Sequence, residues 1–152
     1  MLRRAVELGV NHIDTAQYYG PDVANELIHE ALHPYPDDLV LVSKVGAARD
    51  PDGGWLPAQR PEQLREGVEA NLRSLAVERL DVVNLRLIGD EEADRGPAVS
   101  FEEQLATMVE LREEGKIGGI GLSNVTLELL RAGLAHTQIG RASCRERVFS
   151  SV

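Results

Sequence analysis

The sequence has 152 residues, of which 43% are apolar and 27% charged, and its formal net charge at pH 7 is −9. This composition is that of an ordinary globular protein and excludes collagen, a coiled coil and a disordered chain. The excess of acidic residues argues against nucleic acid as a partner, and no apolar run approaches the roughly 20 residues of a membrane span.

The first third of the chain alternates between helical and strand patterns. Apolar spacing predicts a short helix near the N-terminus and then a strand over 10–15. A second helix begins near Pro21 and ends at His33, because two prolines follow within three residues. The continuous aliphatic run over 39–45 is typical of a strand that is buried on both faces.

The middle of the chain repeats this alternation. A turn cluster over 49–54 leads into a loop that reaches Gln59. Proline in the first turn favours a helix from Pro61 to Leu75, and a third strand is predicted over 80–85. An acidic loop, including 90–94, comes next and is interpreted as a solvated face.

Capping signals define the last two helices. Ser100 and Glu103 form the pattern of a capping box at the start of one helix. A glycine-rich strand is predicted over 117–122, and Asn124 or Thr126 caps the final helix. The predicted elements therefore alternate strictly between helix and strand, from the first helix to the last.

Such alternation predicts an α/β fold with a parallel sheet covered by helices, either a doubly wound sheet or a (β/α)8 barrel. A dinucleotide-binding doubly wound sheet should carry G-x-G-x-x-G after its first strand, whereas the nearest match, over 119–121, lies inside a strand. Polar residues instead end successive strands, namely Asp14, Lys44, Arg86 and Ser123, as in a barrel. Because a complete barrel takes ~250 residues, we predict a partial (β/α)8 TIM barrel.

Lys44 is one of two lysines in the chain, and it ends an otherwise apolar strand. A buried ammonium group needs a carboxylate partner. Asp14 ends the preceding strand, and adjacent strands lie about 4.8 Å apart, so we predict that the two side chains pair. The alternative is a lysine whose head group reaches water.

Tyr19 lies five residues after Asp14, on the same strand-to-helix loop. A nearby cation favours the ionised form of a phenol and makes its hydroxyl a better acid. We therefore predict that Lys44 activates Tyr19 as a proton donor. Taken without Lys44 and Asp14, the pair Tyr18–Tyr19 is better explained as a packing or loop pair.

Three motifs together resemble the aldo-keto reductase family: GVNHIDTAQYYG over 9–20, Val-Ser-Lys-Val over 42–45 and Gly-Leu-Ser-Asn over 121–124. The resemblance covers residues 1–138 and implies about strands 2–5 of a (β/α)8 barrel. It also implies an enzyme that uses NADPH to reduce the carbonyl of a small aldehyde or ketone.

The resemblance carries roles to individual residues. Tyr19 matches the family's general acid, and Lys44 and Asp14 match the pair that tunes it. Ser123 and Asn124 match residues that hydrogen-bond the nicotinamide carboxamide, and Asp14 is also predicted to lie at the cofactor.

Arg86 departs from the family pattern, which generally has histidine at this position. Arginine is always charged and cannot exchange a proton as histidine does, but it can stabilise a carbonyl oxygen that gains negative charge. The sequence 84–86 is similar to that of family members that reduce pyridoxal-like aldehydes, which suggests such a substrate. Alternatively, Arg86 pairs with the acidic loop and has no catalytic role.

Two other functions stay open. The first is a non-catalytic barrel that binds the cofactor as a sensor or regulatory subunit. The second is a metal-dependent hydrolase, which would place His-x-His on an early strand. His12 occupies the first of those places but Asp14 the second, so we predict no metal site.

The C-terminal residues 139–152 differ from the rest. Residues 139–148 resemble an in-frame translation of a DNA sequencing adaptor, and they contain the single cysteine, Cys144. We therefore predict an incomplete barrel domain over 1–138, followed by a non-native tail. The absence of cysteine from 1–138 fits a cytoplasmic protein. A partial barrel leaves strand edges unpaired, so we expect this polypeptide alone to be partly folded or aggregated and inactive.

Overall fold

The computed structural model describes residues 1–87 and 99–144, the last four of these by their backbone alone. The elements in chain order are α1 (Leu2–Glu7), β1 (His12–Asp14), α2 (Val23–Leu32), β2 (Val40–Arg49), β3 (Trp55–Ala58), α3 (Pro61–Leu75), β4 (Leu80–Arg86), α4 (Phe101–Glu113), β5 (Ile117–Val125), α5 (Leu127–His136) and β6 (Ile139–Cys144). The predicted helices and the four predicted strands are all present.

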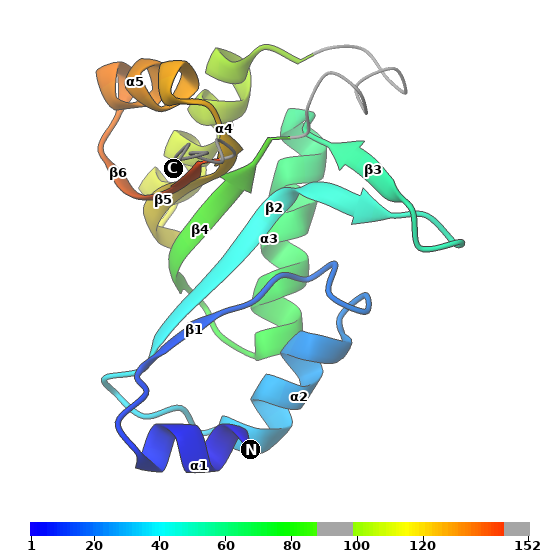
Figure 1. Cartoon of the computed structure of the whole chain (residues 1–152), viewed down its shortest axis with the longest axis vertical. Coiled ribbons are helices and arrows are strands. Elements are labelled where there is room, and N and C mark those ends of the chain that lie inside the picture. The colour runs from blue at the N-terminus through cyan, green and yellow to red at the C-terminus, as the bar shows by residue number, and fades with distance from the viewer. Residues whose placement is uncertain (88–98, 145–152) are drawn as a thin grey trace, which may run out of the picture.

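The strands β1, β2, β4, β5 and β6 lie next to one another in chain order, and each pairs in parallel with the next (Figure 1). A doubly wound sheet reverses its strand order at a switch point, whereas a barrel adds each new strand beside the last one. The observed order is that of a half-barrel. The predicted partial (β/α)8 fold is confirmed.

The helices pack against one face of this sheet. Helix α3 packs on β2 and α4 on β5, while α2 and α4 flank α3 (Figure 1). Side chains alternate between the faces of a strand, so every second residue faces the helices. The buried core on this face includes Leu41, Val45, Val83, Leu85, Ile120 and Leu122, together with Leu64, Val68, Leu105 and Met108 of the helices. The intervening residues, which include Asp14, Lys44, Arg86 and Ser123, face the opposite side.

A hairpin replaces part of the predicted loop before Gln59. Strand β2 continues to Arg49, and β3 pairs with it antiparallel. The turn between them is closed by Asp50, whose Oδ1 accepts hydrogen bonds from the amides of Asp52 at 3.0 Å and Gly54 at 2.6 Å. The turn residues were recognised in the sequence, but the strand pairing that they allow was missed.

Residues 139–144 form β6, although the sequence predicts a non-native tail there, outside the fold. They pair in parallel with β5, with register shifts at two points. Backbone N–H and C=O groups need partners whatever the side chains are, so this strand requires no hydrophobic pattern. That the native domain ends at 138 is still a prediction. Residues 145–152 and the acidic loop 90–94 lie outside the described residues.

Helices α4 and α5 begin at side-chain caps, but in α4 only the Ser100 half of the predicted capping box is found among the described residues. Ser100 Oγ accepts a hydrogen bond from the Glu103 amide at 3.1 Å at the start of α4. Of the two residues considered for α5, Thr126 is the cap, because its Oγ1 accepts from the Leu129 amide at 3.2 Å. These bonds satisfy amide groups that have no partner inside the helix.

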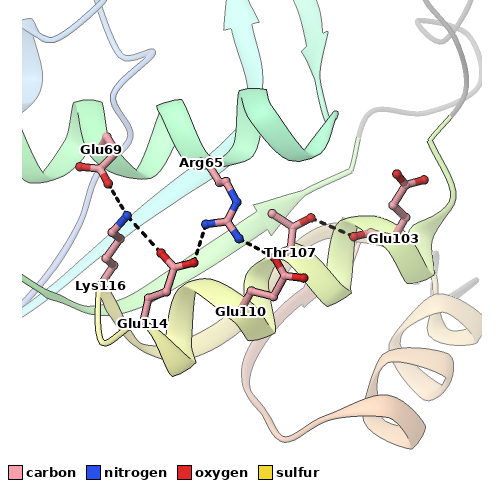
Figure 2. Close-up of polar contacts among 7 residues, drawn as sticks. All are labelled: Arg65, Glu69, Glu103, Thr107, Glu110, Glu114 and Lys116. Atoms are coloured by element: carbon pink, nitrogen blue, oxygen red, sulfur yellow. Dashed lines mark hydrogen bonds and ion pairs between the residues drawn. The ribbon is translucent and has the colours of Figure 1, made fainter.

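Ion pairs join α3 to α4 on the outer surface (Figure 2). Arg65 donates to the carboxylates of Glu110 and Glu114, and Lys116 contacts Glu69 at 2.6 Å and Glu114 at 3.1 Å. The hydrogen bond from Arg65, with a second from Lys116, holds the pKa of the Glu114 carboxyl below its usual value. The cluster therefore favours the folded state while Glu114 is ionised.

In the complete barrel that contains this chain, replacing Arg65 with glutamine should lower the urea midpoint of unfolding by a small amount at neutral pH and low salt, because exposed ion pairs are weak and screened. Since the pKa of Glu114 is lowered in the folded protein, its contribution is present above the ordinary carboxyl range and is lost as the pH falls through the lowered value. The difference between wild type and R65Q should thus shrink in acid. Urea titrations at several pH values measure it, and a difference that does not vary with pH would contradict the assignment.

None of the helices in the described ranges is long and apolar enough to cross a membrane.

Candidate active site

The carboxyl ends of four parallel strands bring the predicted site residues to one edge of the sheet. Asp14 ends β1, Arg86 ends β4, and Ser123 lies near the end of β5. Lys44 lies in the middle of β2, which continues to Arg49, close to the point where the parallel pairing of β2 with β4 ends. The register pairs Asp14 with Val42 and Arg86 with Ser123. Because Leu41, Val83 and Leu85 face the helices, alternation directs the site residues to the other face.

Lys44 and Asp14 form an ion pair. Lys44 Nζ lies 2.6 Å from Asp14 Oδ1, and the two side chains are 12% and 25% exposed. The ammonium group also donates a hydrogen bond to the Thr15 carbonyl oxygen at 3.0 Å. The predicted pairing across neighbouring strands is therefore present, and Lys44 does not reach out to bulk water. A charge-assisted bond of this length in a partly desolvated setting holds the ammonium in one place.

Tyr19 is placed beside this pair. Lys44 Nζ lies 5.1 Å from the centroid of the Tyr19 ring, and Tyr19 is 39% exposed. An incoming molecule can thus reach this ring while the cation stands against it. The structure brings Asp14, Lys44 and Tyr19 together, from two strands and one loop.

The neighbouring Tyr18 has a different environment. It is 2% exposed, and its hydroxyl has no hydrogen-bond partner among the described residues. Burial raises the pKa of Tyr18, because the phenolate would lose its hydration. Its ring meets those of Tyr19 and Trp55 edge to face, with centroids 5.5 and 5.4 Å away. Of the two tyrosines, Tyr18 packs and Tyr19 is the candidate acid.

Arg86 stands at the end of β4 and is half-buried. Its guanidinium carbon lies 4.8 Å from the centroid of the Trp55 ring, which Arg49 also covers at 3.4 Å. Arg86 Nε is buried and has no hydrogen-bond partner among the described residues. The alternative partners of Arg86, the acids of 90–92, lie outside those residues.

The Trp55 stack was largely missed in the sequence. The sequence predicts no contact of Trp55 with Arg49 or Tyr18. One signal was available, since Arg49 and Trp55 flank the turn cluster symmetrically and become a cross-strand pair once the hairpin forms.

Gly46 is a second residue that was missed. Its φ is +99°, and a Cβ atom there would lie 2.4 Å from the carbonyl oxygen of Arg86. Only glycine combines this backbone conformation with so close an approach. Gly46 therefore allows the backbone of β2 to lie in close contact with the backbone of Arg86, the last residue of β4.

Ser123 and Asn124 follow on β5. Asn124 has a positive φ of 62°, and its Nδ2 donates to the Leu87 carbonyl oxygen at 2.6 Å. This bond fixes the orientation of the Asn124 side-chain amide, whose Oδ1 is the acceptor atom that it presents. Asn84 is buried on the same face, with an Oδ1 that has no partner among the described residues. With the Ser123 hydroxyl, which both donates and accepts, these acceptors suit a ligand amide.

A cavity of about 460 Å³ lies between the β2–β3 hairpin and α3, which it follows from Glu62 to Asn71. Lys44 and Tyr18 border it, but much of its lining is small residues with Glu62 and Glu66. Asp14 and Arg86 are not among its lining residues, so we do not assign the substrate to it.

Known proteins are similar to this chain in sequence and in fold. The model of the Aldo/keto reductase family matches residues 1–145. Pyridoxine 4-dehydrogenase of Escherichia coli K12 is 52% identical over 128 residues, which are 83% of this chain and 44% of that protein.

Two solved structures resemble the fold. Glycerol dehydrogenase from Gluconobacter oxydans superimposes with a TM-score of 0.80 at 25% identity, over 94% of this chain and 43% of that one. An aldo/keto reductase from Klebsiella pneumoniae, solved in complex with NADP and acetate, gives 0.70 at 30% identity, over 90% and 42%. The chain thus spans less than half the length of each of these three relatives.

Proposed function

Because this chain belongs to the aldo/keto reductase family, we propose that it is part of a complete barrel that uses NADPH to reduce an aldehyde or ketone. One observation carries the proposal: an ammonium group paired with a carboxylate at 2.6 Å stands 5.1 Å from the ring of an exposed tyrosine. An oxidoreductase of this family needs a proton donor, and this arrangement provides one.

Tyr19 is the proposed proton donor. The bound dinucleotide would supply hydride to the carbonyl carbon, and the carbonyl oxygen then takes up a proton from the Tyr19 hydroxyl. Lys44, which lies beside the Tyr19 ring, is proposed to stabilise the phenolate that is left, because opposite charges attract in a partly desolvated site. Asp14 fixes the ammonium group in place and offsets the cost of its burial.

Arg86 is proposed to stabilise the oxygen as its negative charge develops. Its permanent charge and its hydrogen-bond donors suit that role. Trp55 packs on the guanidinium, and Gly46 allows the close approach of the strands. Unlike the usual histidine, Arg86 does not exchange protons, which leaves proton transfer to Tyr19.

The nicotinamide end of the cofactor is assigned to Ser123 and Asn124. A carboxamide offers N–H donors and a C=O acceptor, and these residues present a hydroxyl and an amide oxygen oriented by the bond to Leu87. Asp14 lies at the same edge of the sheet. The specific use of NADPH is proposed from the family and from the relative solved with NADP.

A pyridoxal-like aldehyde is the proposed substrate. It is supported by the 52% identity to a protein named pyridoxine 4-dehydrogenase, and by the presence of Arg86. A cytoplasmic location is proposed on the absence of cysteine from 1–138.

The test compares two proteins. The complete barrel that contains this chain should oxidise NADPH when pyridoxal is added, whereas the isolated chain of 152 residues should show no turnover, since its sheet cannot close. Loss of NADPH absorbance measures both. A complete barrel that binds NADPH but fails to oxidise it in a single turnover with any added aldehyde would be a sensor rather than an enzyme. Turnover by the isolated chain would contradict the half-barrel argument.

A further inference from the structure

Four polar side chains are buried on the helix side of β1 and β2, behind the ion pair. Thr15 is 3% exposed, and Asn25, Ser43 and Asn71 are fully buried. Burying polar groups is unfavourable unless they are hydrogen-bonded. These four residues bond to one another and to Ser74 and Gly67, and these bonds offset the cost of their burial. We call them the outer hydrogen-bond chain.

The hydrogen bonds connect the end of β1 to β2 by way of one side chain from α2 and one from α3. Thr15 Oγ1 donates to Asn25 Oδ1 at 2.9 Å, and Asn25 Nδ2 donates to Asn71 Oδ1 at 2.9 Å. Ser43 Oγ donates to the same Asn71 oxygen at 2.5 Å. Asn71 Nδ2 donates to the Gly67 carbonyl oxygen of its own helix at 2.7 Å, which fixes the orientation of the amide.

Both ends of the outer hydrogen-bond chain adjoin the catalytic pair. Thr15 follows Asp14, and Ser43 precedes Lys44. Because side chains alternate across a sheet, each catalytic side chain faces the site while its neighbour faces the helices. Thr15 is held from both sides, since its carbonyl oxygen also accepts a bond from Lys44 Nζ at 3.0 Å.

We propose that Thr15, Asn25, Asn71 and Ser43 are positioning residues, which hold β1 and β2 so that Asp14 and Lys44 meet beside Tyr19. The inference rests on the proposed function for its catalytic meaning. Apolar packing lets strands slide slightly, whereas a fully satisfied buried network specifies one arrangement. A displacement of about 1 Å can cost on the order of 10²-fold in rate, so the network has a direct effect on turnover.

Thr15→Val in the complete barrel is the primary test, because it removes the donor and keeps the shape of the side chain. We expect kcat to fall by about 10- to 100-fold with the KM for the aldehyde nearly unchanged. Thr15→Ser, which restores the hydroxyl, should recover most of the loss. Ser43→Ala removes a single bond at the other end and should act in the same direction, which covers the case in which Thr15→Val does not fold.

Thr107→Val is the matched control. Thr107 is also a buried threonine, 4% exposed, but its hydroxyl bonds the Glu103 carbonyl oxygen within α4, away from the site (Figure 2). The Thr107→Val variant should be somewhat less stable than wild type and should have the same kcat. If Thr15→Val lowers stability as Thr107→Val does and leaves kcat unchanged, the outer hydrogen-bond chain only stabilises the fold and the proposal is wrong.

A readout without turnover separates this inference from the proposed function. The ¹³Cε resonance of Lys44, identified as the signal lost in Lys44→Arg, should move in Thr15→Val toward its position in Asp14→Asn, and should not move in Thr107→Val. If the resonance moves in this way but the complete barrel has no reductase activity, the positioning role is supported and the proposed function is wrong. A Lys44 resonance that is unchanged in Thr15→Val would overturn the positioning role in an active enzyme.

Discussion

Tyr19→Phe in the complete barrel is expected to lower kcat by about 10²- to 10⁴-fold, the usual contribution of a general acid. The affinity for NADPH should change little, because the cofactor is assigned to Ser123 and Asn124 rather than to this hydroxyl. Steady-state turnover and a fluorescence titration with NADPH measure the two effects separately. Retained turnover would remove Tyr19 from the acid role.

Tyr18→Phe is the control that the chain itself offers. The Tyr18 hydroxyl is buried and has no partner among the described residues, so its removal relieves an unsatisfied polar group. This variant should keep its turnover and be as stable as wild type or slightly more stable. If Tyr18→Phe abolished turnover and Tyr19→Phe did not, the assignment of the two tyrosines would be reversed.

Lys44→Met is expected to lower kcat by about 10²-fold or more, comparable to the loss of one donor that stabilises charge in a transition state. Methionine has a similar volume but no charge, so the phenolate left on Tyr19 loses its cation. The variant should also be less stable, because Asp14 loses its ion pair in a partly buried position.

The double variant Asp14→Asn/Lys44→Met distinguishes the two effects. Removing both charges should restore much of the stability lost by Lys44→Met, since no carboxylate is then left without its cation. It should not restore turnover. A double variant that regained activity would show that the ion pair supports the fold alone. Thermal unfolding and kcat, measured on the same preparations, decide between these outcomes.

Much of the fold could be predicted because the pattern is local. The continuous aliphatic runs before Lys44 and Arg86 mark strands, and capping residues such as Ser100 and Thr126 mark helix starts. Strict alternation then leaves few topologies. The partner of Lys44 was also predictable, because consecutive strands of a barrel are neighbours and Asp14 ends the preceding one.

The rest depends on contacts between residues far apart in the chain. Asn25 and Asn71 lie on amphipathic helices, where an asparagine is normally expected in solvent, and 46 positions separate them. No local pattern indicates that their amides meet. The stack of Trp55 on Arg86 similarly requires the hairpin to form first. The roles of Tyr19, Lys44, Asp14, Arg86, Ser123 and Asn124 are still predictions.

Trp55 is the single tryptophan of the chain, and it touches Tyr18, Arg49 and Arg86 at the edge of the site. Indole emission is sensitive to nearby charge and to the polarity around the ring. An aldehyde that approaches Arg86 would therefore alter the emission of a fluorophore that this segment already carries. Occupancy of the site can be followed optically, without attaching a dye and independently of hydride transfer.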